Sequence, residues 1–170
     1  ECLFTGDEET GLTGAFEIKS GFMKSEILLN LDSEDEGELF IGCAGGIDTL
    51  AYFDYKNENV PTNHIAYKIS VSGLKGGHSG DDIEKGLGNS NKIINRFLWN
   101  AANDFGLRIS EIDAGNLRNA IAREAFAEII IPEGKETKFE EYFKLFSKNI
   151  KNELAITEPK LSLSIETVEL

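Results

Sequence analysis

Two groups of side chains in this sequence have types and surroundings suited to catalysis, and the first is carboxylic. Glu8 and Glu9 are adjacent, and Asp32 follows a second apolar run. Adjacent residues in an extended or turn conformation point in different directions, so one glutamate can ligate a metal ion while the other faces substrate as a general base. Asp32 could bind the same metal. The alternative interpretation is that all these carboxylates line solvated loops.

The second group is a histidine set among glycines. Residues 72–82 read S-G-L-K-G-G-H-S-G-D-D and contain His78, one of only two histidines in the chain. Glycines allow left-handed backbone and close approach of other groups, and loops often carry binding residues. Alternatively, the glycines only punctuate a strand-to-helix turn and His78 is a solvated bystander. The other histidine, His64, lies beside a polar loop, and we expect no chemical role for it.

The carboxylates follow segments that resemble buried strands. Residues 1–5 include the apolar run C-L-F, residues 26–31 include the apolar run I-L-L, and acidic residues follow each segment. Such runs suit strands covered on both faces, and in open α/β sheets the functional crevice lies beyond the carboxyl ends of the strands. A short helix is expected within 10–21, and residues 38–55 have strand character.

His78 lies in a different, more regular part of the sequence. Apolar residues alternate over 65–72, recur at helical spacing from Asp81 to Phe105, and return to strand-like patterns over 107–113 and 120–131. A helix over 139–154 and a strand over 161–168 follow. The order β-α-β-β-α-β predicts a ferredoxin-like split arrangement, so the fold class is α+β.

Composition excludes several partners. The 170 residues include 17 basic and 30 acidic side chains, giving a net charge of -13, which argues against nucleic acid binding. No apolar run approaches the roughly 20 residues that cross a bilayer, so no membrane association is expected. Cys2 and Cys43 lie in apolar runs, and we expect both to be reduced and buried in a cytoplasmic protein.

Four segments together resemble one enzyme family. They are F-T-G-D-E-E-T-G-L-T-G-A, N-L-D-S-E-D-E-G-E-L-F-I-G-C-A-G-G, V-S-G-L-K-G-G-H-S-G-D-D-I and R-N-A-I-A-R-E-A. In this order they are similar to the aminoacyl-histidine dipeptidases (Xaa-His dipeptidases, PepD type). These are co-catalytic zinc peptidases related to carnosinases, carboxypeptidase G and succinyl-diaminopimelate desuccinylase.

The resemblance implies a role for five residues. Glu8 corresponds to the general base, and Glu9 and Asp32 correspond to ligands of the two Zn²⁺ ions, one for each ion. His78 resembles a lid-domain histidine that reaches a substrate carbonyl or carboxylate, in relatives often from the partner subunit. Asn119 resembles a lid asparagine that contacts the substrate carboxylate. The lids of this family are ferredoxin-like and commonly carry a homodimer interface.

The sequence also departs from the family pattern. An upstream His-x-Asp motif, a bridging aspartate and a final histidine have no counterparts among these residues. We therefore expect a central fragment: a remnant of an α/β catalytic domain over 1–37 and a lid over 38–170, possessing on its own neither peptidase activity nor tight zinc binding. Apolar runs in the first 30 or so residues would lack cover, whereas residues from about 38 onward should pack well.

Three functions follow from these observations. The first is a zinc dipeptidase that hydrolyses Xaa-His dipeptides with metal-activated water and a glutamate base. The second is a non-catalytic ferredoxin-like dimerisation module whose acidic loops are merely solvated. The third keeps the zinc amidohydrolase chemistry but acts on acyl-amino acids.

Overall fold

The computed structural model describes residues 2–32, 36–42, 45, 47 and 49–169. It divides into two compact units, an N-terminal unit of Glu1–Asp54 and a C-terminal unit of Tyr55–Leu170. The sequence suggested a domain boundary after residue 37, whereas this division falls after Asp54; the assignment of the two domains stays a prediction. No helix in the described ranges is long and apolar enough to cross a membrane.

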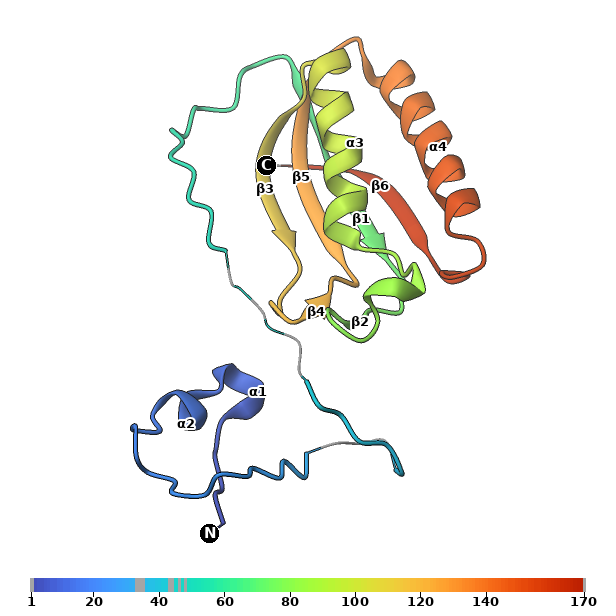
Figure 1. Ribbon diagram of the computed structural model, residues 1–170. Helices are drawn as coiled ribbons and strands as arrows, with labels where there is room; N and C mark the ends of the chain where they lie inside the picture. The colour runs from blue at the N-terminus through green and yellow to red at the C-terminus, as the bar shows by residue number, and fades with distance from the viewer. Residues whose placement is uncertain (1, 33–35, 43–44, 46, 48, 170) are drawn as a thin grey trace. The chain divides into compact units, whose positions relative to one another are not determined.

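The C-terminal unit is built on a four-stranded antiparallel sheet (Figure 1). Its strands are β1 (His64–Ser72), β3 (Arg108–Ala114), β5 (Ala125–Pro132) and β6 (Ser162–Val168), in the spatial order β3-β5-β1-β6. The helices are α3 (Ser90–Phe105) and α4 (Glu136–Glu153). The fold is therefore mixed α/β with an antiparallel sheet, and the element order agrees with the β-α-β-β-α-β pattern of the sequence.

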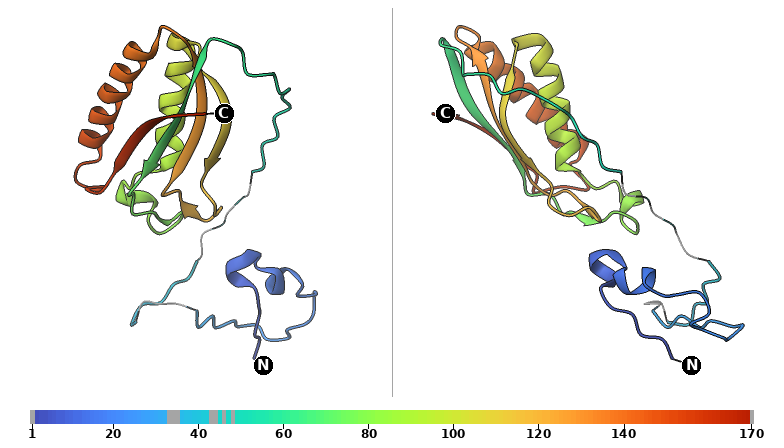
Figure 2. Two further views of the ribbon diagram at one scale, coloured as in Figure 1. Left: turned by 180° about the vertical axis from the view of Figure 1, so that it is seen from behind. Right: turned by 90° about the vertical axis from the view of Figure 1, so that its left-hand side faces the viewer.

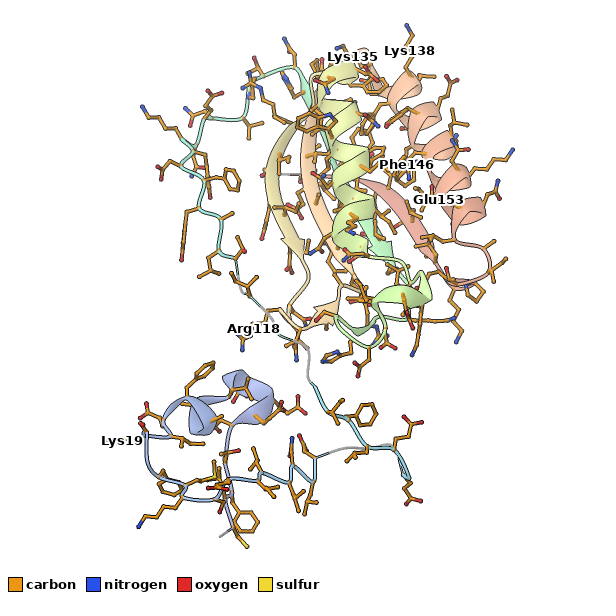
Figure 3. All side chains as sticks on the ribbon, in the orientation of Figure 1. Lys19, Arg118, Lys135, Lys138, Phe146 and Glu153 are labelled. Carbon is orange, nitrogen blue, oxygen red and sulfur yellow. The ribbon has the colours of Figure 1, made fainter. Side chains whose placement is uncertain are left out.

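Both helices cover the same face of the sheet (Figure 2). The alternation predicted for 65–72 is confirmed, since Tyr67, Ile69 and Val71 of β1 are buried. Aromatic rings join the two helices: Phe97 of α3 lies 5.7 Å from Phe139 and 5.2 Å from Phe146 of α4, centroid to centroid. Figure 3 labels Phe146 on α4. Edge-to-face contacts of this kind contribute about 1 kcal/mol each beyond the free energy gained by removing the rings from water.

Two expectations for the C-terminal unit are wrong in detail. The helix predicted from Asp81 begins only at Ser90, after a single 3-10 turn over Ile83–Lys85, because Gly86 and Gly88 disfavour helix and Asn89 supplies the N-cap. The strand predicted over 120–131 is split into β4 (Ala120–Ile121) and β5. Between them, the carbonyl oxygens of Ala122 and Glu124 accept hydrogen bonds from the backbone N–H and the hydroxyl of Ser90, respectively.

The N-terminal unit differs from the sequence expectations more strongly. Its helices are the single turns α1 (Glu8–Gly11) and α2 (Thr13–Phe16), and the described parts of 1–5, 26–31 and 38–55 form no strand. None of its described residues is buried, and Cys2, expected to be buried, is exposed; Cys43 lies outside the described residues. A strand needs a ladder partner and cover for its apolar face, and the described residues supply neither. The well-packed part of the chain accordingly starts near residue 62, not near 38.

Candidate functional site

The C-terminal unit brings His78 and Asn119 together, although 41 positions separate them in the sequence. Strand β2 (Gly77–His78) pairs antiparallel with β4, and His78 lies opposite Ala120. The next bond joins the backbone N–H of Ser79 to the carbonyl oxygen of Asn119 at 3.0 Å. This small ladder lies at one end of the main sheet (Figure 1). His78 and Asn119 are both exposed, so their side chains are accessible to a ligand.

The loop before His78 is fixed by a buried carboxylate. Glu158, which is 3% exposed, accepts hydrogen bonds from the backbone N–H of Lys75 at 2.8 Å and of Gly88 at 2.9 Å. Gly73 has a φ of 77°, and a Cβ there would lie 2.1 Å from the carbonyl oxygen of Lys160. The glycine is therefore required both by its left-handed backbone and by the approach of the chain next to β6.

The His78 ring is held by hydrogen bonds from its own loop. Its Nδ1 accepts the backbone N–H of Gly80 at 3.0 Å and of Asp81 at 3.3 Å. The backbone N–H of His78 donates to Oδ2 of Asp82 at 2.6 Å, and Asp82 also pairs with Lys85. The hydrogen bond from Lys85, followed by the one from His78, holds the pKa of Asp82 below its usual value. The loop therefore holds the imidazole at Nδ1 and leaves Nε2 for a ligand.

The carboxylates expected to bind metal lie in the N-terminal unit. Glu8 and Glu9 form the first turn of α1, and both are exposed. Asp32 is also exposed, and its backbone N–H bonds to the side chain of Asn30. Within the described residues, no group of three or more His, Cys, Asp and Glu side chains comes together to hold a metal ion. The residues present therefore do not by themselves make the expected zinc centre.

Reasoning from the sequence missed the residues that shape the histidine loop. Asp82 and Glu158 were not singled out, although Asp82 accepts the backbone N–H of His78 and Glu158 is buried. The spacing of Asp82 four residues after His78 was the available signal, because Asp side chains often cap backbone N–H groups in tight turns. Nothing in the sequence marks Glu158, whose two partners lie 83 and 70 positions away. An open cavity of about 400 Å³ beside β4, lined in part by Leu117, Arg123 and Phe126, was also not anticipated.

Comparison with known proteins gives three findings. Residues 62–158 match the family model of the peptidase dimerisation domain of M20 peptidases. The chain is 43% identical over 168 residues to the cytosol non-specific dipeptidase of Escherichia coli K12, and the match covers 99% of this chain and 35% of that protein. It also resembles the crystal structure of the aminoacylhistidine dipeptidase of Vibrio alginolyticus, with a TM-score of 0.79 and 40% identity over 98% of this chain and 34% of that one. The chain thus spans about a third of the length of these two proteins.

Proposed function

From the premise that this chain belongs to the M20 peptidase dimerisation-domain family, we propose that it is the lid and dimerisation part of a metal-dependent dipeptidase. Both relatives described above are named as dipeptidases, and their similarity extends over nearly the whole chain. The observation that carries the proposal is the ladder that places His78 beside Asn119. An N–H donor and an amide at one exposed place suit a carboxylate or a developing oxyanion.

The proposed substrate is a dipeptide with a carboxyl-terminal histidine. His78 would donate a hydrogen bond to the scissile carbonyl oxygen or the terminal carboxylate, and Asn119 would contact the carboxylate. These tasks position the substrate and do not require proton transfer. The supporting features are the exposure of both side chains and the rigid backbone beneath them, which Glu158 and the β2–β4 pairing hold in place.

The metal-binding roles belong to the N-terminal unit. We propose Glu8 as general base and Glu9 and Asp32 as one ligand for each of two Zn²⁺ ions, with residues 1–37 belonging to a catalytic domain and 38–170 to the lid. Zinc in such enzymes polarises a carbonyl and lowers the pKa of bound water. Two carboxylates fall short of the coordination that zinc requires, so further ligands must come from residues beyond the described ones. We accordingly propose no hydrolysis and no tight zinc binding by these 170 residues alone.

The lid is proposed to be ferredoxin-like and to form a homodimer through the sheet edge formed by β3. The strand order β3-β5-β1-β6 and the element order support the first point. For the second, β3 is an edge strand, and Ile109 and Ile112 on it are each 52% exposed although they lie opposite buried residues of β5. Trp99 on α3 is 71% exposed. An edge strand with apolar neighbours is a surface that a second copy can cover.

A chimera tests the enzymatic proposal. These 170 residues would replace the homologous segment of the E. coli dipeptidase, and the product would be assayed with zinc on Xaa-His dipeptides, other dipeptides and acyl-amino acids. We expect the chimera to hydrolyse Xaa-His dipeptides. This activity should be lost in E8Q and reduced in H78A and N119A. A folded, metal-loaded chimera that hydrolyses only acyl-amino acids would favour the related amidohydrolase.

The second candidate function is a dimerisation module without catalysis. The matched family model covers only the C-terminal unit, and the apolar edge described above would suffice for this role. A folded chimera without hydrolase activity on any of these substrates, combined with dimerisation of the chain alone, would favour it. A cytoplasmic location is proposed in either case, in line with the name of the E. coli relative.

A further inference from the structure

The carboxylate of Asp82 lies at the centre of the turn that carries His78. Its Oδ2 accepts the backbone N–H of His78 at 2.6 Å, and its Oδ1 pairs with Nζ of Lys85. The backbone N–H of Asp82 donates in return to the carbonyl oxygen of His78 at 3.2 Å. Residues 78 and 82 are thus joined twice, which closes the intervening residues into a tight loop.

Gly77 makes room for this carboxylate. A Cβ at Gly77 would lie 2.7 Å from Oδ2 and 2.9 Å from Cβ of Asp82, closer than side-chain atoms tolerate. The φ of Gly77 is not in the left-handed region, so the close approach of Asp82 is the reason for this glycine. The glycine immediately before His78 therefore leaves the space that the carboxylate of Asp82 occupies.

The loop closed by Asp82 determines which ring nitrogen carries the proton. Nδ1 of His78 faces the backbone N–H groups of Gly80 and Asp81, which are donors, so Nδ1 must supply the lone pair. A neutral imidazole with a bare Nδ1 carries its hydrogen on Nε2. Nε2 is then a hydrogen-bond donor and cannot accept a proton from a nucleophile or water.

We propose that Asp82 is a positioning residue that holds His78 in the Nε2–H form, as a fixed donor to an anionic oxygen of the substrate. The role of the tautomer in catalysis rests on the proposed dipeptidase function, whereas the tautomer itself is a property of this chain. A carboxylate or a developing oxyanion is the ligand class that such a donor selects.

The tautomer is measured directly on the 170-residue chain. Long-range ¹H–¹⁵N spectra separate a bare, pyridine-type nitrogen from a protonated, pyrrole-type one, and H64N leaves His78 as the only histidine for assignment. In the parent chain, Nδ1 of His78 is expected to be pyridine-type and Nε2 pyrrole-type. In D82A the two ¹⁵N shifts should move toward each other as the tautomers mix. D82N keeps an oxygen acceptor for the N–H of His78 and should restore the separation.

The matched control is E84A, which removes a carboxylate from the adjacent 3-10 turn and leaves the residues of the His78 loop unchanged. Its spectrum is expected to equal that of the parent chain. Unchanged ¹⁵N shifts in D82A, or equal changes in D82A and E84A, would overturn the inference. If D82A failed to fold, the weaker variant K85Q, which releases Oδ1 of Asp82, is expected to cause a smaller shift in the same direction. If K85Q caused no such shift, that result would equally contradict the proposal.

Kinetics of the chimera test the consequence for catalysis. D82A is expected to lower kcat/KM about tenfold, in proportion to one lost hydrogen bond to a charged group, and to affect the same parameter, kcat or KM, as H78A. In the double variant H78A/D82A, the loss should equal that of H78A alone, since Asp82 acts through the histidine. Additive losses would contradict the positioning role. If the 170-residue chain shows the expected NMR shifts but the chimera has no activity, the dipeptidase function is contradicted and the positioning inference stands.

Discussion

Ser79 donates its backbone N–H to the carbonyl oxygen of Asn119 at 3.0 Å, and this bond helps to join the two loops that carry the proposed substrate contacts. The bond continues the β2–β4 ladder, in which Gly77 and His78 lie opposite Ile121 and Ala120. Neither loop presents its side chain independently. Both substrate contacts therefore have one common support, and disturbing that support should weaken both.

Removing the Glu158 carboxylate should destabilise the C-terminal unit. E158A leaves the backbone N–H groups of Lys75 and Gly88 without their acceptor, and the latter is buried; hydrogen bonds to a charged group contribute about 1.5–3 kcal/mol each. Urea denaturation is expected to show a loss of about 3 kcal/mol. E153A, which removes the exposed partner of Arg96, should cost less than about 1 kcal/mol. Equal effects of the two variants would contradict a structural role for Glu158.

Two glycines with similar backbone angles should respond differently to alanine. Gly73 and Gly106 have φ of 77° and 70°, but a Cβ at Gly73 meets the carbonyl oxygen of Lys160, whereas nothing lies within 4 Å of one at Gly106. G106A should therefore cost only the left-handed backbone penalty of about 1 kcal/mol. G73A adds a clash with backbone and should cost about 3 kcal/mol or more. Thermal unfolding of both variants makes the comparison, and a G73A variant no less stable than G106A would contradict the clash.

The sequence predicted the elements whose periodicity is complete. Tyr67, Ile69 and Val71 alternate with polar neighbours and form β1, and Gly106 ends α3 as expected. The start of α3 was predicted too early, although Gly86, Gly88 and Asn89 are local signals for it. Hydrogen bonds from Ser90 to the carbonyl oxygens of Ala122 and Glu124, which are distant in sequence, add to these signals. The pattern of apolar residues indicates the period of a helix or strand, whereas the residue at which a helix begins can also depend on contacts with distant parts of the chain.

The individual residues of the candidate site could be predicted from the sequence, but their arrangement in space could not. His78 was singled out by its glycines, and Asn119 by resemblance to a family, but their pairing depends on the β2–β4 register, which no local pattern encodes. The opposite failure occurred at residues 26–31, where Ile27, Leu28 and Leu29 predicted a buried strand. These side chains are exposed, because a continuous apolar run forms a strand only when other strands cover it.

A charge at the free edge of β3 should dissociate the proposed homodimer. I112E places a carboxylate on a strand that already carries Glu111 and Asp113, so two copies would bring several like charges together. Sedimentation velocity is expected to show a dimer for the parent chain and mainly monomer for I112E. I156E, at a position that is 94% exposed beyond α4, makes the same change elsewhere and should leave the dimer intact. A dimer that survives I112E unchanged would require another interface.

The phenol of Tyr67 should make the stability of the chain fall in strongly alkaline solution. Tyr67 is 3% exposed and donates to Oε1 of Glu140 at 3.2 Å; burial, followed by the charge of Glu140, raises the pKa of Tyr67 to about 12. In the unfolded chain, the pKa of tyrosine is about 10. Because the folded value is the higher one, the contribution of Tyr67 is complete below pH 10 and is lost as the pH rises toward 12. Two pKa units correspond to about 2–3 kcal/mol. The measurement compares the parent chain with Y67F, because other groups titrate in the same pH range and their effects cancel in the difference between the two unfolding free energies. This difference should fall by about 2 kcal/mol between pH 9 and pH 12 in urea titrations. A difference independent of pH would mean that the phenol ionises as readily in the folded chain as in the unfolded one.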